Sequence, residues 1–348
     1  AICGIAGTAL QWLRSYLTKR SQVVQVGQCF SAELHLDTGT PQGSCLSCLI
    51  FALFVGDLPL WTSIGLPEAY ADDTFVTVEA ETESELRERL EEEGMNILKY
   101  FASNRLVANK SKTATVVFRR QNQVEPFTIN LAGELITEVP DEKLLGVHIQ
   151  NDLRWERHTN KIKSEVNYAL SVISRLKDYM GRKELRTIAD GLIHSKIRYC
   201  LPVFASEFIR LKESDPQSTM LQSIQRCQND MLRTIVGKRR RDHARIADML
   251  AETNFMSVNQ MVAYSYLMEI WKARFFNVPF LGELLERRRN DDRTLRSNSS
   301  NAVATIGYDV VAQKAEKLWN MSTNRFKTTN LVKVAKLEAK TLAKTLPL

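Results

Sequence analysis

The chain has 348 residues, of which 44% are hydrophobic and 25% are charged, and its formal net charge is +7 at pH 7. This composition is typical of a globular protein, and the length predicts two or three domains. No apolar run approaches the roughly 18 residues that a membrane-spanning helix needs, so we expect no membrane association. The modest basic excess is compatible with a polyanionic partner but does not prove one.

The cysteines favour an intracellular protein. Six of them are scattered along the chain, as reduced thiols inside a cell would be. Cys45 and Cys48 have the spacing of a zinc or redox pair. No second Cys/His pair stands at metal-ligand spacing, so small buried side chains on a helix explain this pair better. The first residues also lack the layout of a secretory signal peptide.

The first predicted elements are a helix over residues 8–19 and a pair of short antiparallel strands. Thr8 can cap the helix, and leucines at positions 10, 13 and 17 give it one apolar face. The strands are predicted around residues 24–26 and 34–36, with Gly27 between them.

A compact loop and a helix follow the strands. Gly39, Gly43 and Pro41 fix a tight bend, and the two glycines allow close approach of another backbone or a nucleotide. Gln42 offers both a donor and an acceptor, while Ser44 can cap the next helix, whose N-terminus favours anions such as phosphate. Apolar residues at 46, 49, 50, 53 and 54 predict that this helix lies in the core. Taken alone, the loop is explained as a capped turn into a core helix.

The next stretch, Tyr70-Ala71-Asp72-Asp73, precedes an alternating apolar run and predicts a tight β-hairpin with two adjacent carboxylates at its tip. One Asp in a turn needs no special explanation. Two neighbouring carboxylates repel each other unless a cation or a basic group lies near them. A hard divalent cation such as Mg²⁺ takes carboxylate oxygens and removes this repulsion.

A long helix and a strand are predicted after the hairpin. The helix runs from the capping box at Thr82 to about residue 105, and the acidic run 91–93 is expected on its solvated face. The block Asn109–Thr113, which contains Lys110 and Lys112, then precedes a predicted strand over 115–118. A surface lysine explains either Lys equally well.

The remainder changes from short strands to helices. Strands are predicted over 127–131, 135–139 and 144–149. From residue 158 onward, four apolar stripes at helical spacing predict the core of a helical domain, and two final helices are expected over 315–319 and 331–342.

Two basic clusters lie in the last third of the chain. The first is Lys238, Arg239, Arg240 and Arg241, after a helix end at Gly237, and the second is Arg287–Arg289. Either could track phosphates without reading sequence. A solvated surface, or a nuclear import signal for the first cluster, explains them equally well. The polar residues 290–305 are predicted to form a loop.

In this order and spacing, the Gly39–Ser44 loop, the Tyr70–Asp73 tip, the Asn109–Thr113 block and Leu144–Val147 resemble the palm and thumb of a reverse transcriptase from a non-LTR (LINE-type) retrotransposon. The resemblance implies an α+β fold: an incomplete polymerase palm, with an antiparallel sheet and helices on one face, followed by a mostly helical thumb and C-terminal domain. The implied domains are a partial palm (1–125), primer-grip-like strands and the palm–thumb junction (126–155), a helical thumb (156–236) and a basic helical C-terminal region (237–348).

The resemblance also implies an RNA-directed DNA polymerase that uses two Mg²⁺ (or Mn²⁺) ions, an RNA template, a DNA primer and dNTPs, in the nucleus. Asp72 would be a metal ligand, and Asp73 a weaker ligand or electrostatic support. Lys112 would act as a general acid or charge clamp. The remaining implied residues are template and nucleotide contacts (Gly39, Pro41, Gln42, Gly43, Ser44, Tyr70, Ala71), the primer grip (Leu145, Gly146, Val147) and backbone contacts (Lys238, Arg239, Arg240, Arg241).

The family's first catalytic Asp lies on a strand before the helix that residues 4–17 resemble, and no acidic residue before Gly39 stands in a matching motif. We therefore expect residues 1–348 to be inactive alone. The alternative is a non-catalytic, nucleic-acid-binding remnant of a retrotransposon.

Overall fold

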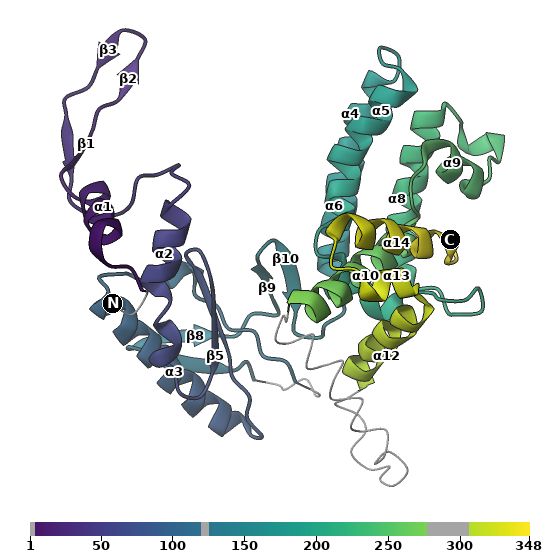
Figure 1. Cartoon of the computed structure of the whole chain (residues 1–348). Helices are drawn as coiled ribbons and strands as arrows, with labels where there is room; N and C mark the ends of the chain where they lie inside the picture. The colour runs from purple at the N-terminus through teal and green to yellow at the C-terminus, as the bar shows by residue number, and fades with distance from the viewer. Residues whose placement is uncertain (1–3, 120–124, 277–305) are drawn as a thin grey trace. The chain divides into compact units, whose positions relative to one another are not determined.

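The computed structural model describes residues 4–119, 125–276 and 306–348, with the backbone alone at 306–310 and 312. The chain forms two compact units, Ala1–Pro140 and Asp141–Leu348 (Figure 1). Cys3, the second basic cluster (Arg287–Arg289) and the predicted loop at 290–305 lie outside the described residues.

The first unit combines helices with short antiparallel strand pairs. Its elements in chain order are α1 (Gly7–Leu17), β1 (Arg20–Gln22), β2 (Gln25–Val26), β3 (Cys29–Phe30), β4 (Leu34–Leu36), α2 (Ser47–Val55), the 3-10 helix η1 (Leu58–Leu60), β5 (Leu66–Tyr70), β6 (Asp73–Thr77), α3 (Glu83–Ser103), the 3-10 helix η2 (Lys110–Lys112), β7 (Thr128–Leu131) and β8 (Glu134–Thr137). Strands are found near both expected positions, but the predicted pairing between them is wrong. β4 pairs with β1 and β2 pairs with β3, and these four strands form a long arm that extends from α1 (Figure 1). The helix begins at Gly7 with Ala6 at the N-cap, so the prediction that Thr8 caps it is wrong.

The α+β class is confirmed, but the strands form separate two-stranded ladders in the described residues rather than one sheet. Two predicted strands are also wrong. Residues 115–118 form no strand, although Val139 N donates to Thr115 O at 2.9 Å. The strand expected over 144–149 is interrupted by a turn at Leu145-Gly146, where both residues have positive φ (46° and 88°) and reverse the chain.

The core of the first unit lies between α3 and the β7–β8 hairpin. Val117, Phe127 and Ile129 are buried there, with apolar side chains of α3 packed against them. By contrast, α2 has no buried residue, and 57% of Leu49 is exposed, so the prediction of a core helix is wrong. This helix has apolar residues on nearly every side. Leu49, Leu53 and Phe54 remain exposed among the described residues. An apolar groove of about 390 Å³ runs between α1 and α2.

One face of α3 also differs from the prediction. The run Glu91–Glu93 was expected to be solvated, yet Glu93 is fully buried and Glu91 accepts a hydrogen bond from Asn130 N at 2.7 Å. A charged run does not by itself identify a solvated face, because Glu93 lies on the side of α3 that meets the amides of residues 63–65.

The second unit is a helical domain preceded by one hairpin. Its elements are β9 (Asp141–Leu144), β10 (Val147–Gln150), α4 (Glu156–Leu176), α5 (Arg182–Ala189), the π-helix η3 (Asp190–His194), α6 (Ser195–Arg198), α7 (Leu201–Ala205), the 3-10 helix η4 (Ser206–Phe208), α8 (Thr219–Val236), the 3-10 helix η5 (Arg240–Asp242), α9 (Ile246–Thr253), α10 (Val258–Phe276), α12 (Ile306–Met321), α13 (Asn324–Thr328) and α14 (Val332–Thr345).

The expected helical stripes form the core of the second unit. Ile162 and Val166 of α4 and Ile224 of α8 are buried, and α4 packs against α8. The central helix is α10, which contacts α7, α8, α12 and α14 and ends near the buried Trp271. The predicted apolar stripe that starts in α5 does not continue to Leu192, which lies in η3 and is 43% exposed. The π-turn of η3 inserts an extra residue and shifts the helical spacing. None of the described helices combines the length and apolar character that crossing a bilayer requires.

Candidate functional site

The acidic tip of the β5–β6 hairpin is a two-residue turn. The strands pair from Leu66 with Thr77 to Tyr70 with Asp73, so Ala71 and Asp72 close the turn. Ala71 has a φ of 55°, a left-handed conformation that costs about 1 kcal/mol for a residue with a Cβ. Asp72 and Asp73 are both exposed, and neither carboxylate has an ion-pair or hydrogen-bond partner among the described residues. Two adjacent free carboxylates are therefore available to a cation at the tip.

The tip supplies only two acidic ligands. Across the described residues, no group of three or more His, Cys, Asp and Glu side chains could hold a metal ion. Cys45 and Cys48 are free and exposed, so the expectation that they are buried side chains is wrong. The carboxylates have the hard oxygen donors that Mg²⁺ prefers and no competing basic partner, so they fit such an ion in chemical type.

Two side chains hold the Gly39–Ser44 loop through hydrogen bonds to backbone carbonyls. Gly39 and Gly43 have φ values of 78° and 84°, which only glycine adopts readily. The Arg20 guanidinium donates to Thr38 O and Gly39 O at 3.1 and 2.6 Å, and the Ser47 hydroxyl donates to Pro41 O at 2.6 Å. These bonds fix the bend.

The side chains of this loop have different environments. Gln42 is exposed, whereas Ser44 Oγ accepts from the Tyr16 hydroxyl at 2.5 Å and from Leu46 N at 3.3 Å. Because α2 begins at Ser47 with Leu46 at its N-cap, Ser44 lies in the preceding turn and the prediction that it caps the helix is wrong. In the described residues no hydrogen bond or ion pair joins this loop directly to the hairpin tip.

The structure distinguishes the two lysines of the Asn109–Thr113 block. Asn109 caps η2 by accepting from Ser111 N at 3.1 Å. Lys110 is ion-paired with Glu134 of β8. Lys112 is exposed and has no carboxylate partner among the described residues. Lys112 is therefore the lysine of this pair with a charge available to an anion.

The predicted primer-grip residues form the β9–β10 turn. Leu145 O accepts from the Tyr199 hydroxyl at 2.6 Å, and Gly146 O accepts from Lys161 Nζ at 3.3 Å. Val147 is buried. Two helical-domain side chains therefore hold the turn through its carbonyls. The sequence does not reveal these roles of Lys161 and Tyr199. The two residues lie 15 and 54 positions from the carbonyls that they bind, and such distant contacts leave no local sequence pattern.

The first basic cluster follows the end of α8 at Gly237, whose φ is 72°, as predicted. Arg240 makes a bidentate contact with Asp230, through Nε to Oδ1 at 3.2 Å and Nη2 to Oδ2 at 2.6 Å. This contact raises the pKa of the Arg240 guanidinium above its usual value. Lys238, Arg239 and Arg241 are exposed and form no ion pair within the described residues. Three of the four charges are thus available to phosphates.

Two histidines are buried in the helical domain and carry no predicted role. Burial lowers the pKa of His158 to about 4, and the neighbouring His148 adds to this effect. His194 lies 3.0 Å from Asp190 and 3.0 Å from Gln228, and burial lowers its pKa as well. Both imidazoles are neutral at pH 7, as is usual for packed core histidines.

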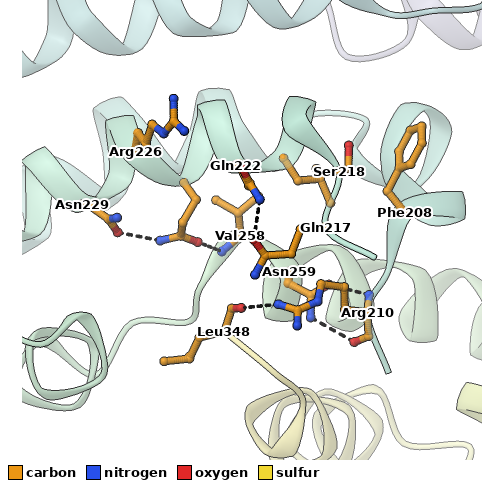
Figure 2. A pocket seen from close by; sticks show the side chains of 12 residues that line it. Phe208, Arg210, Gln217, Ser218, Gln222, Arg226, Asn229, Val258, Asn259 and Leu348 are labelled. Carbon is orange, nitrogen blue, oxygen red and sulfur yellow. Dashed lines mark hydrogen bonds between the residues drawn. The ribbon is translucent and has the colours of Figure 1, made fainter. Parts of the chain in front are cut away.

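A cavity of about 250 Å³, lined by both polar and apolar side chains, lies beside α8 and α10 (Figure 2). Figure 2 shows that its amide side chains bind one another. Gln225 donates to Asn229 at 2.8 Å and accepts from Val258 N at 2.8 Å. The Arg210 guanidinium donates to Leu348 O at 3.1 Å. The cavity contains none of the predicted site residues, and most of its polar groups already have partners.

Comparison with known proteins confirms the resemblance expected from the motifs. The chain is 26% identical over 181 residues to the RNA-directed DNA polymerase from mobile element jockey of Drosophila funebris, a match that covers 48% of this chain and 20% of that protein. It is 25% identical over 185 residues to the probable RNA-directed DNA polymerase from transposon BS of Drosophila melanogaster, covering 51% and 20%. The jockey polymerase of Drosophila melanogaster is 28% identical over 158 residues, covering 43% and 17%.

The chain is therefore similar in sequence to RNA-directed DNA polymerases of non-LTR retrotransposons. It spans about a fifth of the length of the curated relatives it matches. No family model matches the chain, and no solved structure matches it.

Proposed function

We propose that this chain is part of a reverse transcriptase of a non-LTR retrotransposon, a nucleotidyltransferase that extends a DNA primer on an RNA template. The observation that carries the proposal is the exposed Asp72-Asp73 pair at a tight hairpin tip, in a chain whose relatives are named RNA-directed DNA polymerases. A nuclear location is proposed with it and rests on the resemblance alone.

In this proposal Asp72 and Asp73 hold divalent ions, Mg²⁺ or Mn²⁺. Such ions would activate the primer 3′-hydroxyl and stabilise the pyrophosphate that leaves. The exposed Gln42 amide, on a loop fixed by Arg20 and Ser47, would orient the nucleotide or template. The free charge of Lys112 would neutralise the departing pyrophosphate, as an electrostatic clamp or by giving up a proton.

The β9–β10 turn and the first basic cluster complete the proposed contacts. Tyr199 and Lys161 fix the carbonyls of the turn, which leaves Leu145, 36% exposed, to touch the primer. Lys238, Arg239 and Arg241 would contact phosphates without reading sequence.

Two acidic ligands are too few for a two-metal site, because the family uses a further Asp to bridge the ions. We propose that this carboxylate comes from outside the described residues and that residues 1–348 alone are slower by several orders of magnitude.

Primer extension with Mg²⁺ and dNTPs tests both statements. The chain is assayed alone and joined to the segment that precedes the matched region in the jockey polymerase. We expect extension only from the joined protein, and loss of at least about 10³-fold in its Asp72→Ala variant. Extension by residues 1–348 alone would contradict the need for a further carboxylate. A joined protein that binds template–primer but never extends it would favour the alternative, a non-catalytic remnant that binds nucleic acid through the basic cluster.

A further inference from the structure

Helix α3 buries two polar side chains on the same face. Glu93 and Tyr100 both have no exposed surface. They are seven positions apart, which is two helical turns or about 10 Å along the axis. Neither belongs to the proposed contacts with metal, nucleotide or primer.

Glu93 holds the segment that enters the β5–β6 hairpin. Its Oε1 accepts from Ser63 N at 2.7 Å, from Gly65 N at 2.9 Å and from Ile64 N between them. These residues come directly before β5. The other oxygen, Oε2, is buried without a partner in the described residues. A carboxylate buried in this way has a high desolvation cost, which charge-assisted bonds to the three amides must offset.

The segment held by Glu93 is tightly joined to the hairpin. A Cβ on Gly65 would lie 2.5 Å from Val76 Cγ2 of β6, closer than real contacts allow. Only glycine therefore fits where the segment crosses the hairpin. We therefore expect a displacement of residues 63–65 to move the strands that carry the acidic tip.

Tyr100 holds the other end of the same connection. Its hydroxyl donates to Asp57 Oδ1 at 2.8 Å, and its ring meets Trp61 edge to face with centroids 5.7 Å apart. Burial, with a further effect from the Asp57 hydrogen bond, raises the pKa of Tyr100 to about 12, so the hydroxyl stays protonated. Asp57 follows α2, the helix that the Gly39–Ser44 loop precedes.

We infer that Glu93 and Tyr100 are positioning residues that set the distance between the Gly39–Ser44 loop and the Asp72-Asp73 tip. Residues 56–65 connect α2 to β5, and the rigid helix α3 holds this connector at its start through Tyr100 and at its end through Glu93. The functional meaning of that distance rests on the proposed polymerase function. The clamp itself is independent of it.

Hydrogen exchange on the 348-residue chain tests the clamp. In Glu93→Ala, the amides of residues 63–65 should exchange at least about tenfold faster, and the β5–β6 amides should follow. Glu93→Gln keeps a carbonyl oxygen and should restore most of the protection. Glu92→Ala removes the same charge from an exposed neighbour and should change nothing. Unchanged exchange in Glu93→Ala, or an equal effect of Glu92→Ala, overturns the inference.

Spin labels at Gln42→Cys and Asp72→Cys, in a chain whose native cysteines are replaced by serine, measure the positioning directly. We expect a narrow distance distribution that at least doubles in width with Glu93→Ala and narrows again with Glu93→Gln. If Glu93→Ala unfolds the first unit, the milder Tyr100→Phe serves, and an unbroadened distribution there refutes the inference. This readout needs no metal and no reaction, so a failure of the polymerase proposal remains distinguishable from a failure of the clamp.

Discussion

The buried His158 makes the stability of the helical domain depend on pH. Only 3% of this residue is exposed, its Nδ1 accepts from His148 N at 3.4 Å, and its Nε2 has no partner among the described residues. A proton added to Nε2 would therefore find no hydrogen-bond acceptor, and the nearby positive charge of Lys161 disfavours it further. Burial is the largest reason that the pKa of His158 falls to about 4.

The sign and size of the effect follow from this difference. The unfolded chain, with a His158 pKa near 6.5, binds the proton more readily than the folded chain does. Stability is full above pH 6.5 and falls as the pH drops toward 4. The difference of about two and a half pKa units, at about 1.4 kcal/mol each, sets the full loss at about 3.5 kcal/mol, of which about 3 kcal/mol has occurred by pH 4.

Urea unfolding at pH 7, 5.5 and 4, followed by helical circular dichroism, measures the loss. In His158→Gln, the loss of unfolding free energy between pH 6.5 and 4 should be smaller by most of that amount. His243→Asn, at an exposed position with a φ of 46° that Asn tolerates, is the matched control. The buried His194 acts in the same direction and contributes to the slope that remains. Identical pH profiles of the wild type and His158→Gln would refute the reasoning.

Three further predictions concern individual contacts. Tyr199→Phe removes the bond to Leu145 O and should destabilise the helical domain by about 1 kcal/mol in thermal unfolding; no change would mean that this bond contributes nothing to stability. Thr82→Ala removes the cap on Glu85 N and should cost the first unit about 1 kcal/mol, measured by urea unfolding. Lys238→Ala with Arg241→Ala should lower the salt slope of duplex DNA binding by about 0.9 per residue, whereas Arg240→Ala, whose charge Asp230 already engages, should lower it less.

Much of the fold could be predicted because its signals are local. Alternation around Tyr70–Asp73 gave the β5–β6 hairpin, and helical spacing gave the buried faces of α4 and α8. These patterns succeed where each element buries one side against a neighbour in its own unit. Periodicity failed at Leu192, because a π-turn shifts the spacing by one residue without a sequence marker.

The residues of the candidate site could be predicted from the sequence, but the residues that hold them in place could not. The tip and loop carry recognisable short motifs, whereas the groups that hold them, such as Glu93 and Tyr199, act from distant positions. Leu145-Gly146 was expected within a strand because its neighbours are apolar; the positive φ of both residues makes it a turn instead. The outer face of α2 was expected to be buried because apolar spacing indicates a buried face without identifying the element that covers it.

Manganese binding at the hairpin tip tests the central claim most directly. Mn²⁺ added to the isotopically labelled chain should broaden the amide resonances of residues 71–74 first, and excess Mg²⁺ should reverse the effect. The isosteric double variant Asp72→Asn with Asp73→Asn should lose it. Broadening that is absent from the tip, or unchanged in the double variant, would contradict the account.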